Sequence, residues 1–221
     1  MGKGIKLEAA AALIPDGAVL MIGGFMGVGS PHRMIAELVR QGQKNLTIIA
    51  NDTAMPHFGI GQLIEAKAVK KVIASHIGLN PETQRQMIAG EIEVELCPQG
   101  SIAERIRAAG FGLGGVLTPT GVGTSVAQGK RTIEVDGKSF LLETPLTADF
   151  ALIAAHQADY YGNLSYMLTA RNFNPVMSMA AKIVIAEADA IVPVGVIPPD
   201  SVVTPSVLVT HLVEKEKING R

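Results

Sequence analysis

Short apolar runs alternate with amphipathic stretches along the first half of the chain. The run at residues 18–22 contains no polar residue, which is typical of a strand buried on both faces of a parallel sheet. Between such runs, apolar residues recur at helical spacing. Strands are therefore predicted at 18–22, 46–50, 71–75 and 92–96, and helices at 6–14, 31–40, 61–66, 81–89 and 101–109. This alternation predicts an α/β fold with an open, mostly parallel, doubly wound sheet.

The pattern changes after residue 110. The glycine-rich stretch 110–115 predicts no regular structure. Residues 131–143 alternate in polarity around the pair Asp136-Gly137, which predicts a small antiparallel hairpin with a type I′ turn, inserted beside the main sheet. Buried-strand character returns at 150–155, 183–186 and 190–194. Because no low-complexity linker interrupts the sequence, we expect residues 1–221 to form a single domain.

A glycine-rich loop follows the first predicted strand. Its four glycines fall within seven residues: Gly23, Gly24, Gly27 and Gly29. Ser30 and Pro31 then predict a helix start, with a hydroxyl that accepts a backbone N–H and a proline in the first helical position. A strand, a loop and a helix N-terminus in this order place backbone donors where an anionic or oxyanionic ligand can approach. The alternative is a tight turn that needs glycine only for its dihedral angles.

The common nucleotide-binding loops do not fit this segment. A P-loop requires a lysine after its last glycine, and none follows here. The dinucleotide pattern Gly-x-Gly-x-x-Gly, begun at Gly27, has His32 in its sixth position. The loop is therefore predicted to bind something other than a dinucleotide.

Polar or glycine-rich residues follow four of the predicted strands. They are Gly23-Gly24, Asn51-Asp52, His76 and Pro98-Gln99. In open α/β sheets, ligands bind beyond the carboxyl ends of the strands. These residues are therefore expected to share one site.

Composition narrows the classes of partner. A net charge of −1 without a basic run argues against nucleic acid. Only 18% of the 221 residues are charged, which indicates that another subunit covers part of the surface. No apolar stretch approaches the roughly 20 residues that span a bilayer, and residues 2–6 do not begin a secretory signal. We therefore expect a cytoplasmic protein that binds no membrane.

Reactive side chains are sparse. Cys97 is the only cysteine and is expected to be a core thiol. The histidines show no metal-ligand spacing, so no metal site is predicted. His76 follows Ser75, but neighbours on a strand point apart, which argues against a Ser/His pair. Arg171 could anchor a carboxylate, but we favour a structural role in a loop or subunit interface.

Residues 16–31 resemble the first signature of the class I coenzyme A transferases. The matching positions are Asp16-Gly17, Leu20-Met21-Ile22, Gly23-Gly24-Phe25, Gly29 and Pro31. Four further segments are similar to the alpha subunit of the acetate/acetoacetate CoA-transferases, and they are 50–53, 98–100, 117–124 and 170–175. The similarity covers nearly the whole chain.

This resemblance implies that the chain is one subunit of an enzyme that moves CoA between an acyl-CoA and a short-chain carboxylate. In the family, a glutamate in a Ser-Glu-Asn-Gly motif is the nucleophile. The motif is absent here, and in two-gene versions of the family it belongs to the beta subunit. The resemblance therefore implies no catalytic residue on this chain, an α₂β₂ assembly, and no cofactor, with CoA as a substrate. It leaves open whether the acyl group is acetate, acetoacetate, butyrate or a dicarboxylate.

The resemblance also implies which residues bind CoA and the acyl group. The binding loop comprises Gly23, Gly24, Phe25, Met26, Gly27, Val28 and Gly29, whose backbone N–H groups are suited to the thioester or acyl oxygen. Gln99 is expected to donate its amide to a substrate carboxylate or carbonyl. Asn51 is a weaker candidate, because asparagine after a strand is also an ordinary turn former.

Two other functions fit the same fold. A sugar-phosphate isomerase would need an acid/base pair at the strand ends, for which Asp52 and His76 are the candidates, and a phosphate clamp, which is not evident. A non-catalytic acyl-CoA sensor would bind CoA without turnover.

Overall fold

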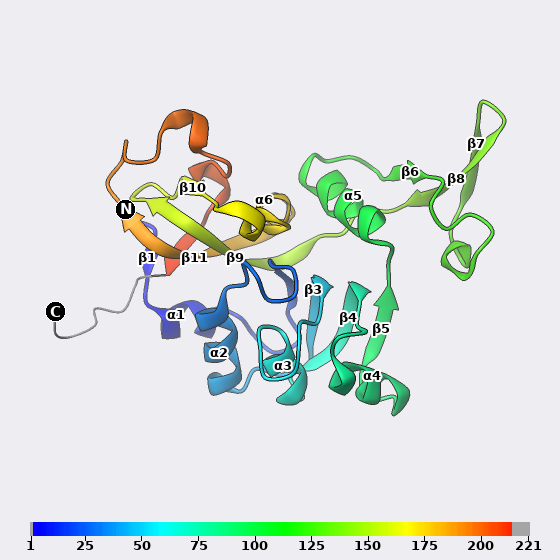
Figure 1. Ribbon diagram of the computed structural model, residues 1–221, viewed down its shortest axis with the longest axis horizontal. Coiled ribbons are helices and arrows are strands. Elements are labelled where there is room, and N and C mark those ends of the chain that lie inside the picture. The colour runs from blue at the N-terminus through cyan, green and yellow to red at the C-terminus, as the bar shows by residue number, and fades with distance from the viewer. Residues whose placement is uncertain (1, 214–221) are drawn as a thin grey trace.

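A nine-stranded, mostly parallel sheet forms the centre of the protein, which we describe from a computed structural model that covers residues 2–213 (Figure 1). The strand order is β1-β12-β11-β9-β2-β3-β4-β5, and β10 pairs with β9 as the one antiparallel addition in the described residues. The strands are β1 (Gly4–Ile5), β2 (Val19–Ile22), β3 (Leu46–Asp52), β4 (Val69–His76), β5 (Glu93–Leu96), β9 (Ala148–Asp159), β10 (Leu164–Ser165), β11 (Ala181–Val192) and β12 (His211–Val213). The predicted parallel α/β sheet is confirmed.

Helices cover both faces of this sheet. The α-helices are α1 (Leu7–Ala12), α2 (His32–Gln41), α3 (Gly61–Glu65), α4 (Pro81–Ile88), α5 (Gln99–Gly110) and α6 (Asn174–Met177). Four short 3₁₀ turns lie at Ser125–Ala127, Leu168–Arg171, Pro199–Ser201 and Ser206–Leu208. Along β2, Leu20 and Ile22 pack into the cluster that contains α1, α2 and α3, whereas Met21 packs with α5 and α6. Strand side chains alternate between faces, so this split confirms the doubly wound arrangement.

The insertion is a three-stranded antiparallel sheet that extends away from the main body on the right of Figure 1. Its order is β6-β8-β7, with β6 at Val116–Thr118, β7 at Thr132–Val135 and β8 at Lys138–Glu143. Asp136 and Gly137 have φ of 49° and 72°, as a type I′ turn requires. The predicted hairpin is confirmed, but β6 was not expected, because three residues paired with a distant strand carry little local signal.

The second half of the sheet differs from expectation in strand length. The predicted strands at 183–186 and 190–194 are one strand, β11, and the prediction at 150–155 covers only half of β9. These two long strands pair with each other from Ala181↔Ala148 to Val192↔Asp159. Polar residues separate the two predicted stretches, and Glu187 is accommodated within β11 because its carboxylate accepts from the N–H groups of Arg33 and Met34.

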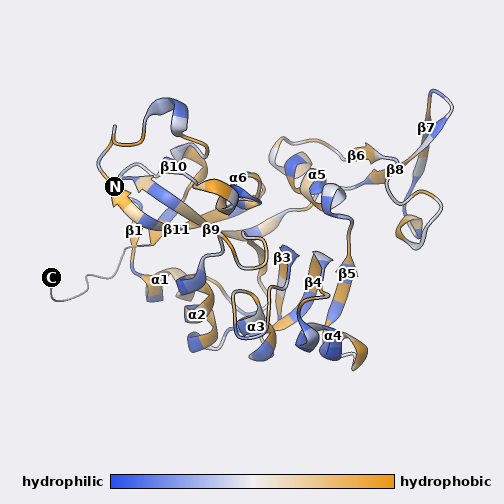
Figure 2. Ribbon diagram, in the orientation of Figure 1, coloured by the Kyte–Doolittle hydropathy of each residue, from blue (hydrophilic) through white to orange (hydrophobic). Residues whose placement is uncertain are grey.

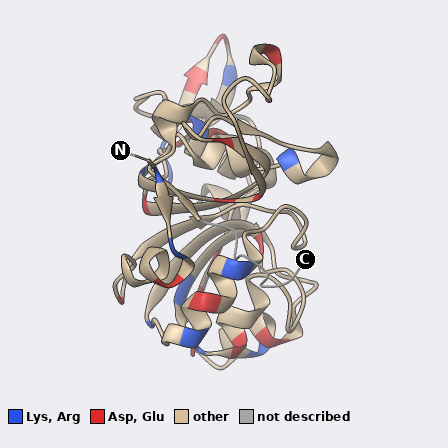
Figure 3. Ribbon diagram, turned by 90° about the vertical axis from the view of Figure 1, so that its left-hand side faces the viewer, with Lys and Arg blue, Asp and Glu red and all other residues tan. Residues whose placement is uncertain are grey.

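Charge and hydropathy are distributed as in an ordinary globular surface. Figure 2 shows apolar residues concentrated on the strands and on the inner sides of the helices. Figure 3 shows basic and acidic residues interspersed on the helices in the lower half of the view, without a stretch of one sign. Within residues 2–213, no helix is both long enough and apolar enough to cross a membrane.

The sheet core should dominate stability. Leu152 is fully buried in β9 and pairs in register with Ile22 of β2 and Ile185 of β11. Leu152→Ala is expected to lower the free energy of unfolding by about 2–5 kcal/mol, because it leaves a cavity between three strands. Urea denaturation checks this, with Val207→Ala as control. Val207 is 86% exposed, so a comparable loss in that variant would contradict the assignment.

Candidate functional site

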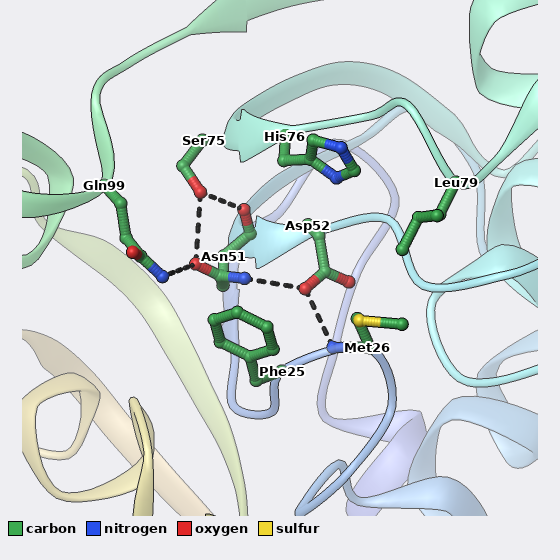
Figure 4. A pocket seen from close by; sticks show the side chains of 8 residues that line it. All are labelled: Phe25, Met26, Asn51, Asp52, Ser75, His76, Leu79 and Gln99. Atoms are coloured by element: carbon green, nitrogen blue, oxygen red, sulfur yellow. Dashed lines mark hydrogen bonds between the residues drawn. The ribbon is translucent and has the colours of Figure 1, made fainter.

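The carboxyl ends of β2, β3 and β4 meet the start of α5 around a cavity of about 360 Å³ (Figure 4). Its lining residues are Phe25, Met26, Asn51, Asp52, Ser75, His76, Leu79 and Gln99. The expected convergence is found for Asn51, Asp52, His76 and Gln99, whereas Gly23, Gly24 and Pro98 do not line this cavity. One detail differs, since Asn51 and Asp52 are the last two residues of β3 rather than a turn after it.

A chain of hydrogen bonds orders one wall of this cavity. Gln99 Nε2 donates to Asn51 Oδ1 at 2.8 Å, and Asn51 Nδ2 donates to Asp52 Oδ2 at 2.7 Å. Ser75 Oγ donates to the Asn51 carbonyl oxygen at 2.7 Å (Figure 4). Asn51 is 2% exposed, and both ends of its amide are engaged within the protein. Asn51 therefore orients the exposed Gln99, and Gln99 is the group that faces the cavity.

Asp52 holds two backbone segments at the rim of the cavity. Its Oδ2 accepts from Met26 N–H at 2.8 Å, and its Oδ1 accepts from Ala54 N–H at 2.7 Å. Met26 and Ala54 have φ of 49° and 53°, a left-handed conformation that costs a residue with a side chain of order 1–3 kcal/mol. The carboxylate offsets that cost. Asp52 thus organises the cavity, a role that no local pattern indicated.

The histidine of the cavity has no hydroxyl partner. Ser75 directs its hydroxyl to Asn51, while the exposed His76 follows it on β4. This confirms that the two side chains do not form a Ser/His pair. Because Asp52 already accepts from three donors, it is also a poor candidate for the base of an isomerase.

Most donors of the glycine-rich loop are used inside the protein. Gly23 N–H donates to Leu152 O at 2.9 Å, and Gly24 N–H donates to Asn172 Oδ1 at 3.1 Å. Phe25 and Val28 exchange two backbone bonds of 3.0 and 2.9 Å, and Met26 N–H donates to Asp52. Of the seven loop residues, only Gly27 and Gly29 have an N–H group for which the described part of the chain supplies no acceptor. The structure thus narrows the expected row of donors to two, and ligand binding at the loop stays a prediction.

Gly24 and Gly27 are two of the loop positions at which the geometry requires glycine. Gly24 has φ of 122°, and a Cβ there would overlap the Ser30 hydroxyl. Gly27 has φ of 83°, and a Cβ there would overlap the ring of Phe58. A side chain at either position would thus collide with the protein itself.

The N-terminus of α2 is occupied by a carboxylate of the protein. Glu187 on β11 accepts from the N–H groups of Arg33 and Met34 at 3.2 and 3.0 Å. Ser30 does not cap the helix, because its hydroxyl donates to Gly23 O at 3.0 Å and α2 begins after Pro31. The expected cap by Ser30 and helix start at Pro31 were wrong. The negative charge of Glu187 already complements the helix dipole, so a ligand would use loop donors instead.

A second, more apolar cavity of about 610 Å³ adjoins the first across Phe25 and Met26. It is lined by Phe25, Met26, Val28, Thr169 and Asn172. Phe25 is 42% exposed and Val28 is 50% exposed. Leu168, beside this cavity in sequence, is 87% exposed. The loop thus presents apolar side chains to solvent, while Asn172 and Asp52 hold its backbone through hydrogen bonds.

No glutamate lines either cavity in the described residues. Glu82 and Glu91 lie outside both cavities, where both bond to Arg85, at 2.8 and 3.0 Å. Arg85 lowers the pKa of each of these two carboxyl groups to about 2. Glu95 pairs with Arg105 at 3.1 Å. That this chain carries no nucleophilic carboxylate stays a prediction.

Cys97 lies behind the site rather than in it. Its side chain is 2% exposed, and burial raises the pKa of the thiol despite Arg105 Nη1 at 3.6 Å from Sγ. This supports a core thiol. Arg171 is exposed in the 3₁₀ turn after Met167, and its role stays a prediction. Among residues 2–213, no three metal-ligating side chains come together.

Comparison with known proteins gives one consistent family. Residues 5–215 match the family model described as Coenzyme A transferase. The chain is 52% identical to the acetate CoA-transferase subunit alpha of Escherichia coli K12, over 96% of this chain and 97% of that one. It is 49% identical to the acetoacetyl-CoA:acetate/butyrate CoA transferase alpha subunit of Clostridium acetobutylicum, over 96% and 97%.

Solved structures share the fold. An acyl-CoA transferase from E. coli O157:H7 superposes with a TM-score of 0.85 at 23% identity, over 97% of this chain and 47% of that one. This chain thus spans about half the length of that protein. Glutaconate coenzyme A-transferase of Acidaminococcus fermentans gives a TM-score of 0.84 at 21% identity, over 96% and 75%.

The fold and the matches define a transferase subunit of the coenzyme A class. This chain belongs to the coenzyme A transferase family, and its relatives are alpha subunits. The resemblance seen in the sequence is confirmed. The relatives support a transferase rather than an isomerase or a sensor. Their designation as subunits implies a second chain.

The contribution of Asp52 can be measured on this chain alone. Asp52→Asn places an amide N–H₂ against Met26 or Ala54 N–H, so we expect a loss of about 1–3 kcal/mol in the free energy of unfolding. Chemical denaturation gives this value. Asp200→Asn, at an exposed position in a short 3₁₀ turn, is the matched control. Equal stability of the two variants would show that Asp52 does not hold the rim.

Proposed function

We propose that this chain is the alpha subunit of a heteromeric enzyme that moves CoA between an acyl-CoA and a short-chain carboxylate of the acetate/acetoacetate type. The observation that carries the proposal is a cavity with the exposed amide of Gln99 in its wall, in which the carboxylate of Asp52 is already taken up by three hydrogen bonds. The identities of 52% and 49% to alpha subunits of such enzymes support it. The nucleophilic glutamate comes from a beta subunit, in an α₂β₂ assembly in the cytoplasm. CoA is a substrate, and no cofactor takes part.

The reaction divides between the two chains. The partner's glutamate carboxylate attacks the acyl-CoA carbonyl, expels the CoA thiolate and forms an acyl anhydride. The thiolate then attacks the glutamyl carbonyl, which releases the carboxylate product and leaves an enzyme–CoA thioester. A second carboxylate reverses these steps. Negative charge develops on a carbonyl oxygen each time, so a prearranged donor stabilises every step.

This chain supplies such donors. The N–H groups of Gly27 and Gly29 have no acceptor within the described residues, and one donor of this kind contributes about 2.7–4 kcal/mol to acyl transfer. Gln99 is held by Asn51 at the opposite wall, where its exposed amide can donate to a substrate carboxylate. The exposed apolar residues Phe25 and Val28 are where we place the partner, because its glutamate must reach this cavity.

Reconstitution from two purified chains tests whether the nucleophilic glutamate comes from the beta subunit. The purified chain alone is expected to show no CoA transfer between acetyl-CoA and acetoacetate. Addition of a beta-type chain that carries the Ser-Glu-Asn-Gly motif should restore transfer and yield a CoA adduct on that chain, seen by mass spectrometry.

A partner variant with Gln in place of that glutamate is the control and should form no adduct. Transfer by this chain alone would contradict the proposal. Saturable CoA binding without turnover in the assembly would favour a sensor, and aldose–ketose interconversion would favour an isomerase.

The docking surface can be tested separately. Leu168 is 87% exposed beside the apolar cavity, and its φ of 51° is one that aspartate tolerates well. Leu168→Asp is expected to weaken association with the beta-type chain at least tenfold, because it buries a charge in the interface. Sedimentation or calorimetry measures this. Ile88→Asp, at an 82% exposed position at the end of α4, should leave affinity unchanged. Equal effects would refute this placement of the partner.

A further inference from the structure

The glycine-rich loop is held from behind by one side chain that lies about 150 residues further along the chain. Asn172 Oδ1 accepts from Gly24 N–H at 3.1 Å and from Phe173 N–H at 2.7 Å. Its Nδ2 donates to Val28 O and to Thr169 O, each at 2.9 Å. The amide therefore bonds to both arms of the loop, one at Gly24 and the other at Val28, and also to its own segment.

Gly24 and Val28, the two residues that Asn172 holds, lie on either side of Gly27, whose backbone N–H is the free donor within the described residues. Between them, Phe25 and Val28 bond to each other, and Met26 N–H is taken by Asp52. Gly27 is then the one residue between Gly24 and Val28 whose N–H has no acceptor in the described chain. The direction of that N–H depends on how the two arms are spaced. Asn172 sets the spacing on one side and Asp52 on the other.

The neighbouring Asn174 makes a different set of contacts. It is fully buried, its Oδ1 accepts from Ala154 N–H at 3.0 Å, and its Nδ2 donates to Gly29 O at 2.9 Å. Asn174 therefore joins the end of the loop to β9, and we assign it a structural role in the fold. Asn172 instead lines the apolar cavity and is partly accessible. Its loss should therefore disturb the loop more than the fold.

We propose that Asn172 is a positioning residue for CoA transfer, which holds the loop so that Gly27 N–H points at the oxygen of the reacting acyl group. This rests on the proposed function. Asparagine suits the role because one planar group offers two donors and an acceptor. Aspartate would keep the acceptor but set a carboxylate oxygen against the carbonyls of Val28 and Thr169.

The test uses the reconstituted two-subunit enzyme. Asn172→Ala should lower kcat about 10–100-fold while KM for acyl-CoA changes less than about 3-fold, because a misplaced donor is lost mainly in the transition state. Asn172→Asp should lose at least as much. Asn172→Ser, which keeps a hydroxyl donor and acceptor, should retain more kcat than Asn172→Ala, and it serves as the second variant if the alanine form does not assemble.

Asn163→Ala is the matched control. Asn163 bonds to Asp159 Oδ2 at 2.8 Å and accepts from Ser206 N–H at 2.9 Å, so it also joins distant segments, but it lies in the β9–β10 turn. Its loss should lower Tm without lowering kcat. A kcat within twofold of wild type for Asn172→Ala, or an equal kcat loss in Asn163→Ala, would overturn the positioning role while the transferase stands. An inactive wild-type assembly would overturn the proposed function, and this role with it.

Discussion

The buried carboxylate of Asp52 is the contact on which the rest of the site depends. It accepts from Met26 and Ala54, two residues with a left-handed backbone that would otherwise be costly. It also accepts from Asn51, which in turn orients Gln99. One charged group at the end of β3 thus sets the position of the loop, the next segment and the exposed amide. Hydrogen bonds to a charged acceptor are strong enough to hold such strained turns.

A consequence of this arrangement is a site with donors and no nucleophile. Most backbone N–H groups of the glycine-rich loop donate to acceptors inside the protein, among them Leu152, Asn172 and Asp52. The N–H groups of Gly27 and Gly29 are the two that remain free within the described residues. Several carboxylates are engaged elsewhere, Glu187 at the start of α2 and Glu82 and Glu91 in ion pairs with Arg85. Under the proposed function, such a cavity is one half of an active site that a second chain completes. Relatives named as subunits fit that description.

Much of the fold was predictable because its signals are local. Apolar runs without alternation predicted β2, β3 and β4, and the Asp136-Gly137 pair predicted the type I′ hairpin. The failures share a cause. β6 and β10 are strands of three and two residues, too short for a periodic signal, and β11 contains polar residues, so each is set by pairing with another strand rather than by its own pattern. The convergence of Asn51, His76 and Gln99 was predictable from the rule for parallel strand ends, whereas the organising role of Asp52 was not.

The alternation of strands and helices in the first half of the chain, the family, and the meeting of Asn51, His76 and Gln99 at the strand ends thus follow from the sequence read locally, since periodicity, turn residues and motif spacing act over a few residues. Which N–H groups are available for a ligand was decided only in three dimensions. Gly24 finds its acceptor on Asn172, 148 residues away, and Met34 finds its acceptor on Glu187, 153 residues away. Hydrogen-bond partners so distant are set by how the sheet closes, and no stretch of sequence carries that information.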